Sequence, residues 1–293
     1  MFKNAIIYRI TEGWTPEIID MEVALGRQVF EPCGPTQEKS GGWVPPRGPE
    51  HGALVEAVAG QRIAMFQIET KSVPGPVVKR HLDERIAKIE QERGRKPGRK
   101  ESRELREDIV MELLPQAFPK TASVWVWIDL QARRLVLDTS SQARADEVIT
   151  ALVRAFDGLK LAPLNTEKPP KLCMIGWLID PDSIPVNMAL GRHVELQSSD
   201  EIQSLVKFDR HHLDDEQMRL HIGQGKLPTK LALDWRGMVS FVLTDRGQLR
   251  RIELLDAGEG EREEDAFDAD VAIATGALSE LIDDLVPALG GVL

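Results

Sequence analysis

Two stretches of the sequence match each other at a constant offset of 165 residues. Ala24-Leu25-Gly26-Arg27-Gln28-Val29 aligns with Ala189-Leu190-Gly191-Arg192-His193-Val194. The same offset pairs further positions, namely Gly60 with Gly225, 6–10 with 171–175, and 62–68 with 227–233. A constant offset across several elements indicates an internal duplication, in which each copy folds into a similar unit. We therefore expect two related units within the 293 residues of the chain.

Hydrophobic periodicity predicts one order of elements for both copies: strand, helix, strand, strand, helix, strand. This order is a split βαβ arrangement, so we expect an α+β fold built from duplicated units. In the first copy the elements are expected at about 5–10, 16–26, 28–31, 42–44, 50–60 and 62–69. In the second copy they are expected at about 170–179, 183–191, 193–197, 205–208, 214–224 and 229–235.

An antiparallel hairpin and a helix are expected to follow in each copy. Runs of β-branched and aromatic residues predict hairpins that pair 124–128 with 135–137 and 239–243 with 249–254. Ser141 is the expected N-cap of the first helix, and the second helix is expected at about 276–289. Trp125 and Trp127 alternate along the first hairpin, so we expect them in the core rather than stacked on bases.

About 40 residues, 76–115, are inserted in the first copy alone. Apolar side chains fall on one helical face before and after a break at Gly94, Pro97 and Gly98. We predict a helical hairpin that projects from a globular body as an arm. The predicted organisation is a first unit at 1–75 and 116–165, the arm at 76–115, and a second unit at 166–293 with an acidic insert at 256–270.

The formal net charge of −10 hides a strong asymmetry along the chain. From Glu253 onward there are twelve acidic residues and one basic residue, which leaves 35 acidic and 36 basic side chains in residues 1–252. The arm has the opposite character, because 79–106 holds eleven Lys/Arg against six Asp/Glu. Its centre, 93–100, has five cations and no acid. Such a concentration predicts an anionic partner, and we expect this partner to be duplex DNA.

The remaining composition excludes several classes of protein. No apolar run approaches the ~18 residues that a membrane span requires. Charge at Lys3 and Arg9 interrupts the N-terminus too early for a signal peptide. Cys33 and Cys173 form no CxxC pair, so we expect neither a disulfide framework nor a zinc site. The expected location is the reducing cytoplasm, and we expect no cofactor.

Short motifs follow one another along the chain in a specific order. They are Phe2-Lys3-Asn4, Tyr8-Arg9, Gly42-Trp43-Val44-Pro45-Pro46, Ile86-Ala87-Lys88-Ile89-Glu90, Leu113-Leu114-Pro115-Gln116-Ala117-Phe118, Trp127-Ile128-Asp129, Thr229-Lys230-Leu231-Ala232-Leu233-Asp234-Trp235 and Phe267-Asp268-Ala269-Asp270. Through the order and spacing of these motifs the chain resembles the recombination-associated protein RdgC family over nearly its full length.

The resemblance implies a ring-shaped homodimer that encircles duplex DNA, binds it without sequence preference and restrains RecA-promoted recombination. It also implies a cytoplasmic, nucleoid-associated location and no enzymatic activity. In the family, the segment that matches 113–120 lies where two arms meet, so Phe118 is implied as an apolar contact in closure of the dimer. Pro119-Lys120-Thr121 departs from the family pattern directly after it.

Non-specific affinity for DNA comes mainly from neutralised phosphates and released counterions, a task that suits cations on flexible stems. The candidates in the arm are Lys79, Arg80, Arg85, Lys88, Arg93, Arg95, Lys96, Arg99, Lys100 and Arg103. The candidates for the inner wall of a ring are Lys207, Arg210, His211 and His212. For the arm helices, a solvated face with i,i+4 ion pairs such as Glu84 with Lys88 is an equal alternative. For the loop we favour phosphate contact.

Two other function classes remain open. Asp129, Asp138 and Asp234 are expected at strand ends and could ligate the metal of a nuclease. A P-loop ATPase is disfavoured, because Leu227 stands after Gly223-Gln224-Gly225-Lys226 where Ser or Thr is required. The other class is a protein-interaction scaffold that acts directly on a recombinase.

Overall fold

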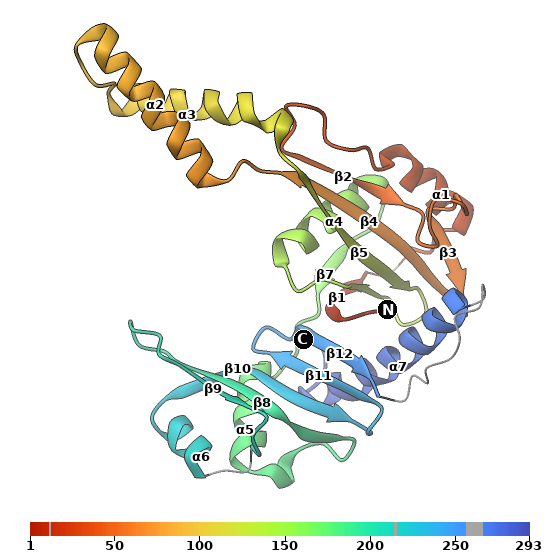
Figure 1. The fold of residues 1–293 in the computed structure, drawn as a ribbon. Coiled ribbons are helices and arrows are strands. Elements are labelled where there is room, and N and C mark those ends of the chain that lie inside the picture. The colour runs from red at the N-terminus through yellow and green to blue at the C-terminus, as the bar shows by residue number, and fades with distance from the viewer. Residues whose placement is uncertain (12, 214–215, 256–265) are drawn as a thin grey trace.

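The computed structural model describes residues 1–11, 13–213, 216–255 and 266–293 (Figure 1). Its strands are β1 (Asn4–Ile10), β2 (Lys39–Val44), β3 (Val55–Val58), β4 (Gln61–Lys71), β5 (Pro119–Asp129), β6 (Arg134–Leu137), β7 (Leu161–Pro163), β8 (Met188–Ser198), β9 (Leu205–Asp209), β10 (Lys226–Trp235), β11 (Val239–Thr244) and β12 (Leu249–Leu254). Its helices are α1 (Ile18–Leu25), α2 (Gly75–Arg93), α3 (Arg99–Leu113), α4 (Gln142–Ala155), α5 (Pro170–Ile179), α6 (Glu216–Gly223) and α7 (Ala266–Ala288).

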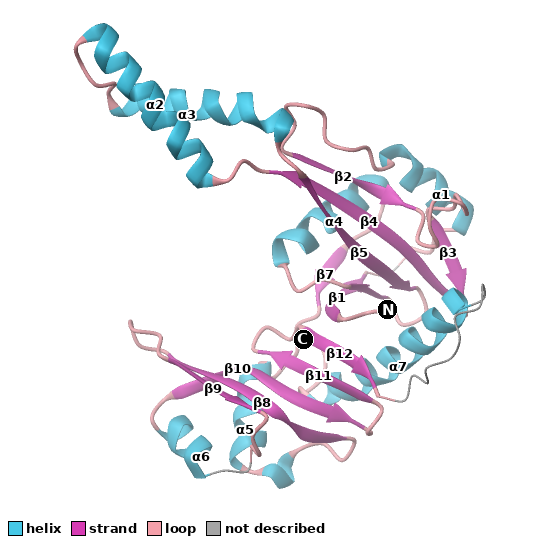
Figure 2. Cartoon of the chain, in the orientation of Figure 1, coloured by secondary structure: helices cyan, strands magenta, loops and turns pink. Residues whose placement is uncertain are grey.

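All twelve strands belong to one sheet, whose order is β2-β4-β5-β6-β1-β12-β11-β10-β8-β9 (Figure 2). The short strands β3 and β7 pair outside this path, with β4 and β1 respectively. Every pair of strands in the sheet is antiparallel. A mixed fold with a large antiparallel sheet and helices grouped around it confirms the predicted α+β class.

The strand β1 joins the two halves of the sheet. The first half holds β2–β7 and the second half holds β8–β12. Residues 6–9 pair with β6 and residues 8–10 pair with β7, both in the first half. At the other end of the strand, Asn4 and Ala5 pair with Arg250 and Leu249 of β12. A strand of seven residues therefore holds together segments that lie almost 250 residues apart in the sequence.

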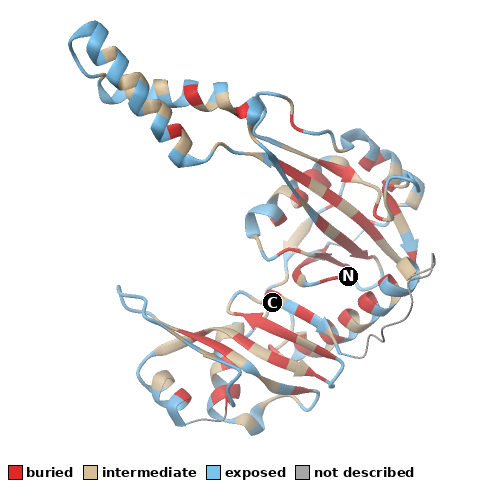
Figure 3. Ribbon diagram, viewed as in Figure 1, coloured by how far each residue is buried: buried red, intermediate tan, exposed pale blue. Residues whose placement is uncertain are grey.

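Two hydrophobic clusters stabilise the sheet from opposite faces. The first lies under α1 and α4 and includes Trp43 and Phe66, whose rings meet edge to face at a centroid distance of 4.9 Å. The second is formed around α7, whose Leu281 packs in one cluster with Leu233 of the second half and Trp127 of the first. Figure 3 shows buried residues along α7 and in the strands of both halves. Because α7 buries side chains of both halves, the two halves share one core.

The predicted helical arm is confirmed. The helix α2 ends at Gly94, which adopts a left-handed conformation (φ +66°) and donates its N–H to the Glu90 carbonyl at 2.9 Å. Gly98 then precedes the first residue of α3. Val78 and Ile109 are the buried residues of the two helices, and both belong to the end of the arm nearest the body. Figure 1 shows a crescent-shaped body, with the arm extending from one end and the β8–β9 tip forming the other.

Several further predictions are confirmed, among them both hairpins, the helix α6 and the burial of Trp127. The predicted N-cap at Ser141 is also confirmed, because its side chain accepts a hydrogen bond from the Arg144 N–H. The last helix begins earlier than predicted, at Ala266. The acidic insert predicted at 256–270 therefore continues into α7, and its part at 256–265 lies outside the described residues.

Four element predictions are wrong. The strand predicted at 170–179 is the helix α5, which follows Pro169 and begins at Pro170, a residue that favours the first turn of a helix. The helix predicted at 183–191 is replaced by a 3-10 turn and the start of β8. The helix predicted at 50–60 is a turn followed by β3, and the strand predicted at 28–31 is only a single bridge between Val29 and Trp43.

The matched hexapeptides thus differ in structure. Residues 24–28 complete α1 and the 3-10 turn after it, whereas residues 189–194 run through β8. Sequence identity over a few residues did not carry the same backbone conformation, because the surrounding contacts decide it.

Candidate nucleic-acid interface

The cations of the arm loop have acidic neighbours that the loop itself lacks. Arg93 and Arg95 both donate to Glu101, at 3.3 and 3.2 Å, and Lys96 lies 3.8 Å from Glu90. The acids come from α2 and α3, so the loop is less unbalanced than its own eight residues indicate.

Ion pairs also run along the arm helices. They are Arg85 with Glu112, Lys88 with Glu92 at 4.0 Å, Lys100 with Glu104 at 3.9 Å and Arg103 with Glu107 at 2.9 Å. The partner of Lys88 is therefore Glu92 and not the predicted Glu84, which instead lies 3.7 Å from His81. The solvated face considered for these helices has real ion pairs.

These pairs leave the arm able to bind an anion. Surface ion pairs contribute only about 0–1 kcal/mol each, because both charges remain hydrated. Lys100 and Arg103 keep 91% and 81% of their side-chain surface exposed despite their partners. Within the described ranges, no ion pair engages Lys79, Arg80 or Arg99. A phosphate can therefore replace a carboxylate at small cost, or meet an unpaired cation directly.

A second cationic group lies at the other end of the crescent, on β8–β10 and the segment that follows β9. Lys207 on β9 lies 3.3 Å from Glu195, which also accepts two bonds from Lys230 at 3.1 Å. Burial alone would raise the pKa of Glu195, but the bonds from Lys230 and Lys207 outweigh burial and hold that pKa below its usual range. Glu195 is thus ionised and neutralises part of the charge of the two lysines.

Arg210 and His212 line a cavity of about 720 Å³ on this part of the sheet, together with Arg192 and Arg251 and with the acids Asp209, Asp234 and Glu253. Both Arg210 (φ +55°) and Arg251 (φ +50°) have left-handed backbones. His211, by contrast, bonds the carbonyl of His212 through Nδ1 at 2.7 Å and packs beside Phe208. The structure therefore brings Arg210 together with cations from distant strands, whereas Lys207 and His211 do not line the cavity.

Sequence reasoning missed Arg192, Lys230 and Arg251. They lie on three different strands, so no local run of charge identifies them. Lys230 and Arg251 fall within the strands predicted at 229–235 and 249–254, which indicates an exposed sheet face but not its function, and Arg192 falls between two predicted elements. The arm cations and this second group are far apart within one chain (Figure 1).

Phe118 is 89% exposed and lies between a 3-10 turn at Leu114–Gln116 and β5, at the base of the arm. An aromatic ring this exposed loses favourable burial energy unless another surface covers it. In the described part of the chain, it is the one aromatic side chain among the large hydrophobic residues that are exposed.

Comparison with known proteins places these features in a family. The family model described as "Putative exonuclease, RdgC" matches residues 1–292. The chain belongs to the RdgC family. Proteins named recombination-associated protein RdgC from Cupriavidus pinatubonensis and Herminiimonas arsenicoxydans are each 38% identical over 296 residues, which cover 99% of this chain and 98% of each protein. The protein of the same name from Bordetella pertussis is 36% identical over the same lengths. The resemblance found in the sequence is confirmed.

Two of the motifs that carry the RdgC resemblance meet in the fold. Arg47, directly after Gly42–Pro46, forms ion pairs with Glu56 at 3.2 Å and with Asp268. Its guanidinium also lies 4.5 Å from the centre of the Phe267 ring. These contacts attach the start of α7 to the first half of the sheet, which gives both motifs a structural role.

Two of the three carboxylates considered for a nuclease, Asp129 and Asp138, have structural partners in this RdgC-family chain. Asp129 is buried, accepts a bond from the Ala132 N–H at 2.8 Å and lies 3.9 Å from Arg134. Asp138 accepts the N–H groups of Asn4 and Lys3 at 2.8 and 3.2 Å, and burial raises its pKa. Asp234 lines the cavity around Arg210.

Two kinds of feature are absent from the described residues. No group of three or more His, Cys, Asp or Glu side chains there is arranged to hold a metal ion. In the same residues, no helix combines the length and hydrophobicity needed to cross a membrane.

Proposed function

We propose that this RdgC-family protein binds duplex DNA without sequence preference. The observation that carries the proposal is the concentration of eleven Lys/Arg at 79–106 on an arm that projects into solvent. Flexible cations without a rigid hydrogen-bonding frame suit phosphates, which carry no sequence information. The cavity around Arg210 at the opposite end, where three arginines lie beside three acids, would be a weaker second contact region for the same duplex.

We further propose that the protein encircles DNA as a ring-shaped homodimer. The crescent has two ends, so two copies related by a two-fold axis can close a ring when the ends meet. Phe118, exposed at the base of the arm, supplies an apolar contact for that closure. A ring that occupies the duplex would restrain RecA-promoted recombination, which agrees with the name of its relatives and favours a cytoplasmic location on the nucleoid.

The two halves support a proposal of internal duplication. β4, β5 and β6 follow one another as neighbours in the sheet, as do β10, β11 and β12 in the second half, and both series lead toward β1. The strands β4 and β10 begin at Gln61 and Lys226, the offset found in the sequence. The arm is then an insertion between β4 and β5.

Salt titration tests the DNA interface. Changing Arg93, Arg95, Lys96, Arg99 and Lys100 together to Gln should weaken binding to random-sequence duplexes and reduce the slope of log K against log salt by about 0.9 per lost contact. Arg99→Gln alone should lower the slope by about 0.9 at most, whereas Arg27→Gln, an exposed cation beside α1, should leave it unchanged. An unchanged slope for the five-residue variant would show that the arm loop does not contact DNA.

The ring requires a separate measurement. A closed dimer should load onto linear duplexes much faster than onto covalently closed circles, and Phe118→Ser should reduce this difference by opening the ring. Equal loading by the unaltered protein on both substrates would contradict a closed ring. The oligomeric state of both proteins, measured by light scattering, serves as the control.

We propose that the protein is not an enzyme, and the description of its family model as an exonuclease makes this worth testing. Labelled duplex incubated with Mg²⁺ and the protein should remain intact. Degradation that is lost in Asp129→Asn would establish the nuclease alternative. The scaffold alternative predicts a different pattern, namely no DNA affinity at low salt together with direct binding to RecA.

A further inference from the structure

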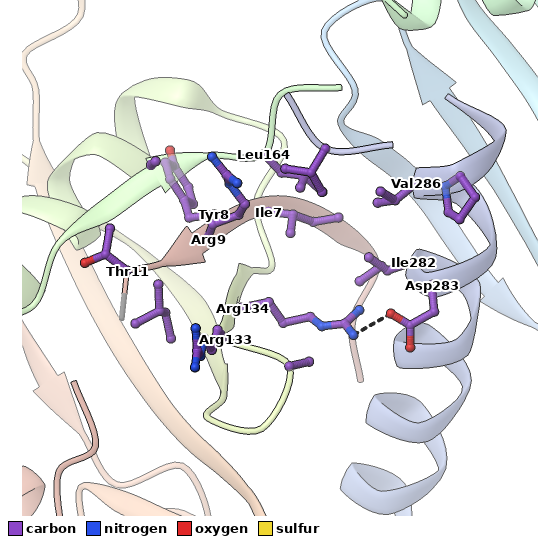
Figure 4. A pocket seen from close by; sticks show the side chains of 15 residues that line it. Ile7, Tyr8, Arg9, Thr11, Arg133, Arg134, Leu164, Ile282, Asp283 and Val286 are labelled. Carbon is purple, nitrogen blue, oxygen red and sulfur yellow. Dashed lines mark hydrogen bonds and ion pairs between the residues drawn. The ribbon is translucent and has the colours of Figure 1, made fainter. Parts of the chain in front are cut away.

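A cavity of about 540 Å³ lies at the junction of the two halves, between β1 and the C-terminal part of α7 (Figure 4). Sites for small ligands usually measure about 300–1,000 Å³. Its apolar wall includes Ile7 on β1, Leu164 after β7, and Ile282 and Val286 on α7. A neighbouring cavity of about 320 Å³ shares these four side chains, so the apolar surface continues beyond the first cavity.

The cavity is also lined by Arg9, Arg133 and Arg134, and among the residues that the structure describes no acid pairs with Arg9. Arg9 of β1 and Arg134 of β6 are register partners in neighbouring strands, and their side chains point in different directions (Figure 4). Arg134 is buried and satisfied, because it donates to Asp283 at 2.6 Å and to the Ser279 carbonyl at 3.3 Å (Figure 4). Arg9 is exposed, and the described residues include no acid paired with it.

We propose that this cavity binds an apolar carboxylate. The carboxylate group would pair with the guanidinium of Arg9, whose planar fork suits two parallel hydrogen bonds. The apolar body of the ligand would lie against Ile7, Leu164, Ile282 and Val286. Such a group occurs in a free organic acid and at the C-terminal residue of a polypeptide.

The site is independent of the DNA interface, since it shares no residue with the arm or with the cavity around Arg210. The bound ligand would contact β1 from the first half and α7 from the second. Because it binds only the folded protein, it should raise the melting temperature.

Two acids and their neutral analogues test the proposal on the full-length protein. Octanoate represents a free organic acid, and N-acetylphenylalanine represents a polypeptide terminus; octanamide and N-acetylphenylalanine amide are the uncharged controls. At least one acid should bind with Kd of about 0.1–1 mM, as expected for a ligand of this size. Binding should shift the methyl resonances of Ile7, Ile282 and Val286, and the matching amide should bind about 10-fold more weakly.

Variants identify the cation and the cavity. Arg9→Gln should weaken binding of the acid about 10-fold and leave the amide unaffected, whereas the matched control Arg27→Gln should change neither. Val286→Phe, checked for folding by circular dichroism, should abolish binding of both by filling the cavity. The acid that binds tells which source the site prefers. The proposal is wrong if neither acid shifts these resonances at 10 mM, if the amide binds equally well, or if Arg9→Gln binds the acid as the unaltered protein does.

Discussion

Gly42 of β2 lies against the backbone of the segment that follows α1. A Cβ atom at this position would lie 2.5 Å from both the backbone nitrogen and the Cα of Phe30, a distance that real Cβ atoms do not adopt. Gly42→Ala should therefore displace that segment or β2 and lower the free energy of unfolding by about 1–3 kcal/mol, measured by chemical denaturation.

Gly26 provides the matched control for this substitution. Its backbone is helical (φ −60°) and a Cβ would meet nothing within 4 Å. Gly26→Ala should be neutral or slightly stabilising, because alanine loses less entropy on folding. Equal destabilisation by both substitutions would show that the contact with Phe30 is unimportant.

Glu195 confers a dependence of stability on pH. Since the pKa of Glu195 is lower in the folded protein than in the unfolded chain, its ionised form stabilises the fold above the unfolded value of about 4.3. That contribution is lost as the pH falls through the folded pKa. Glu195→Gln should lower the free energy of unfolding by about 1–2 kcal/mol at pH 7. The difference from the unaltered protein should shrink below about pH 4.3, and a constant difference at all pH values would contradict this account.

The candidate nucleic-acid interface shows how far a sequence can predict such a surface. The cations of 93–100 were identifiable because they are adjacent in the chain. Their partners Glu90 and Glu101 lie just outside that window and reach the cations through side-chain geometry. The group around Arg210 was only partly identifiable, because pairing of distant strands brings Arg192 and Arg251 to it.

The arm should be less stable at its tip than at its base. Only Val78 and Ile109 are buried in α2 and α3, and both are near the body, so the outer turns depend on half-buried contacts and exposed ion pairs. Amide hydrogen exchange should be fastest near Gly94–Gly98 and slow progressively toward the base. Uniform protection along both helices would contradict this gradient.

Ile109 allows that gradient to be tested by substitution. Ile109→Ala should remove about 2–4 kcal/mol of local stability and accelerate exchange through the whole arm. Met111→Ala, in the same helix but 60% exposed, should have little effect.

Elements with regular amphipathic patterns or strong terminal signals were predictable, whereas uniformly apolar ones were not. The apolar run at 170–179 fits a buried strand or a buried helix equally well, and only the packing of Met174, Trp177 and Leu178 against the sheet decides for the helix. The helix predicted at 183–191 followed from the assumed repeat, but residues 188–190 of this range pair with β10.

The whole chain should unfold in one cooperative step, although the sequence predicts separate units. Leu281 of α7 is fully buried in a cluster that includes residues of both halves. Calorimetry should therefore show one transition, and Leu281→Ala should weaken hydrogen-exchange protection in β5 as well as in β10. Two transitions, or an effect confined to the second half, would mean that the halves are stable independently.

Because of its position in the sheet, β1 is paired on both edges only late in the synthesis of the protein. The strand leaves the ribosome well before its partner β12, which follows about 245 residues later. At about 5–20 residues per second, the nascent chain waits roughly 12–50 s before the edge of β1 near Asn4 and Ala5 is paired. During that interval the edge can pair with a second nascent chain, so slower translation should increase aggregation of this protein.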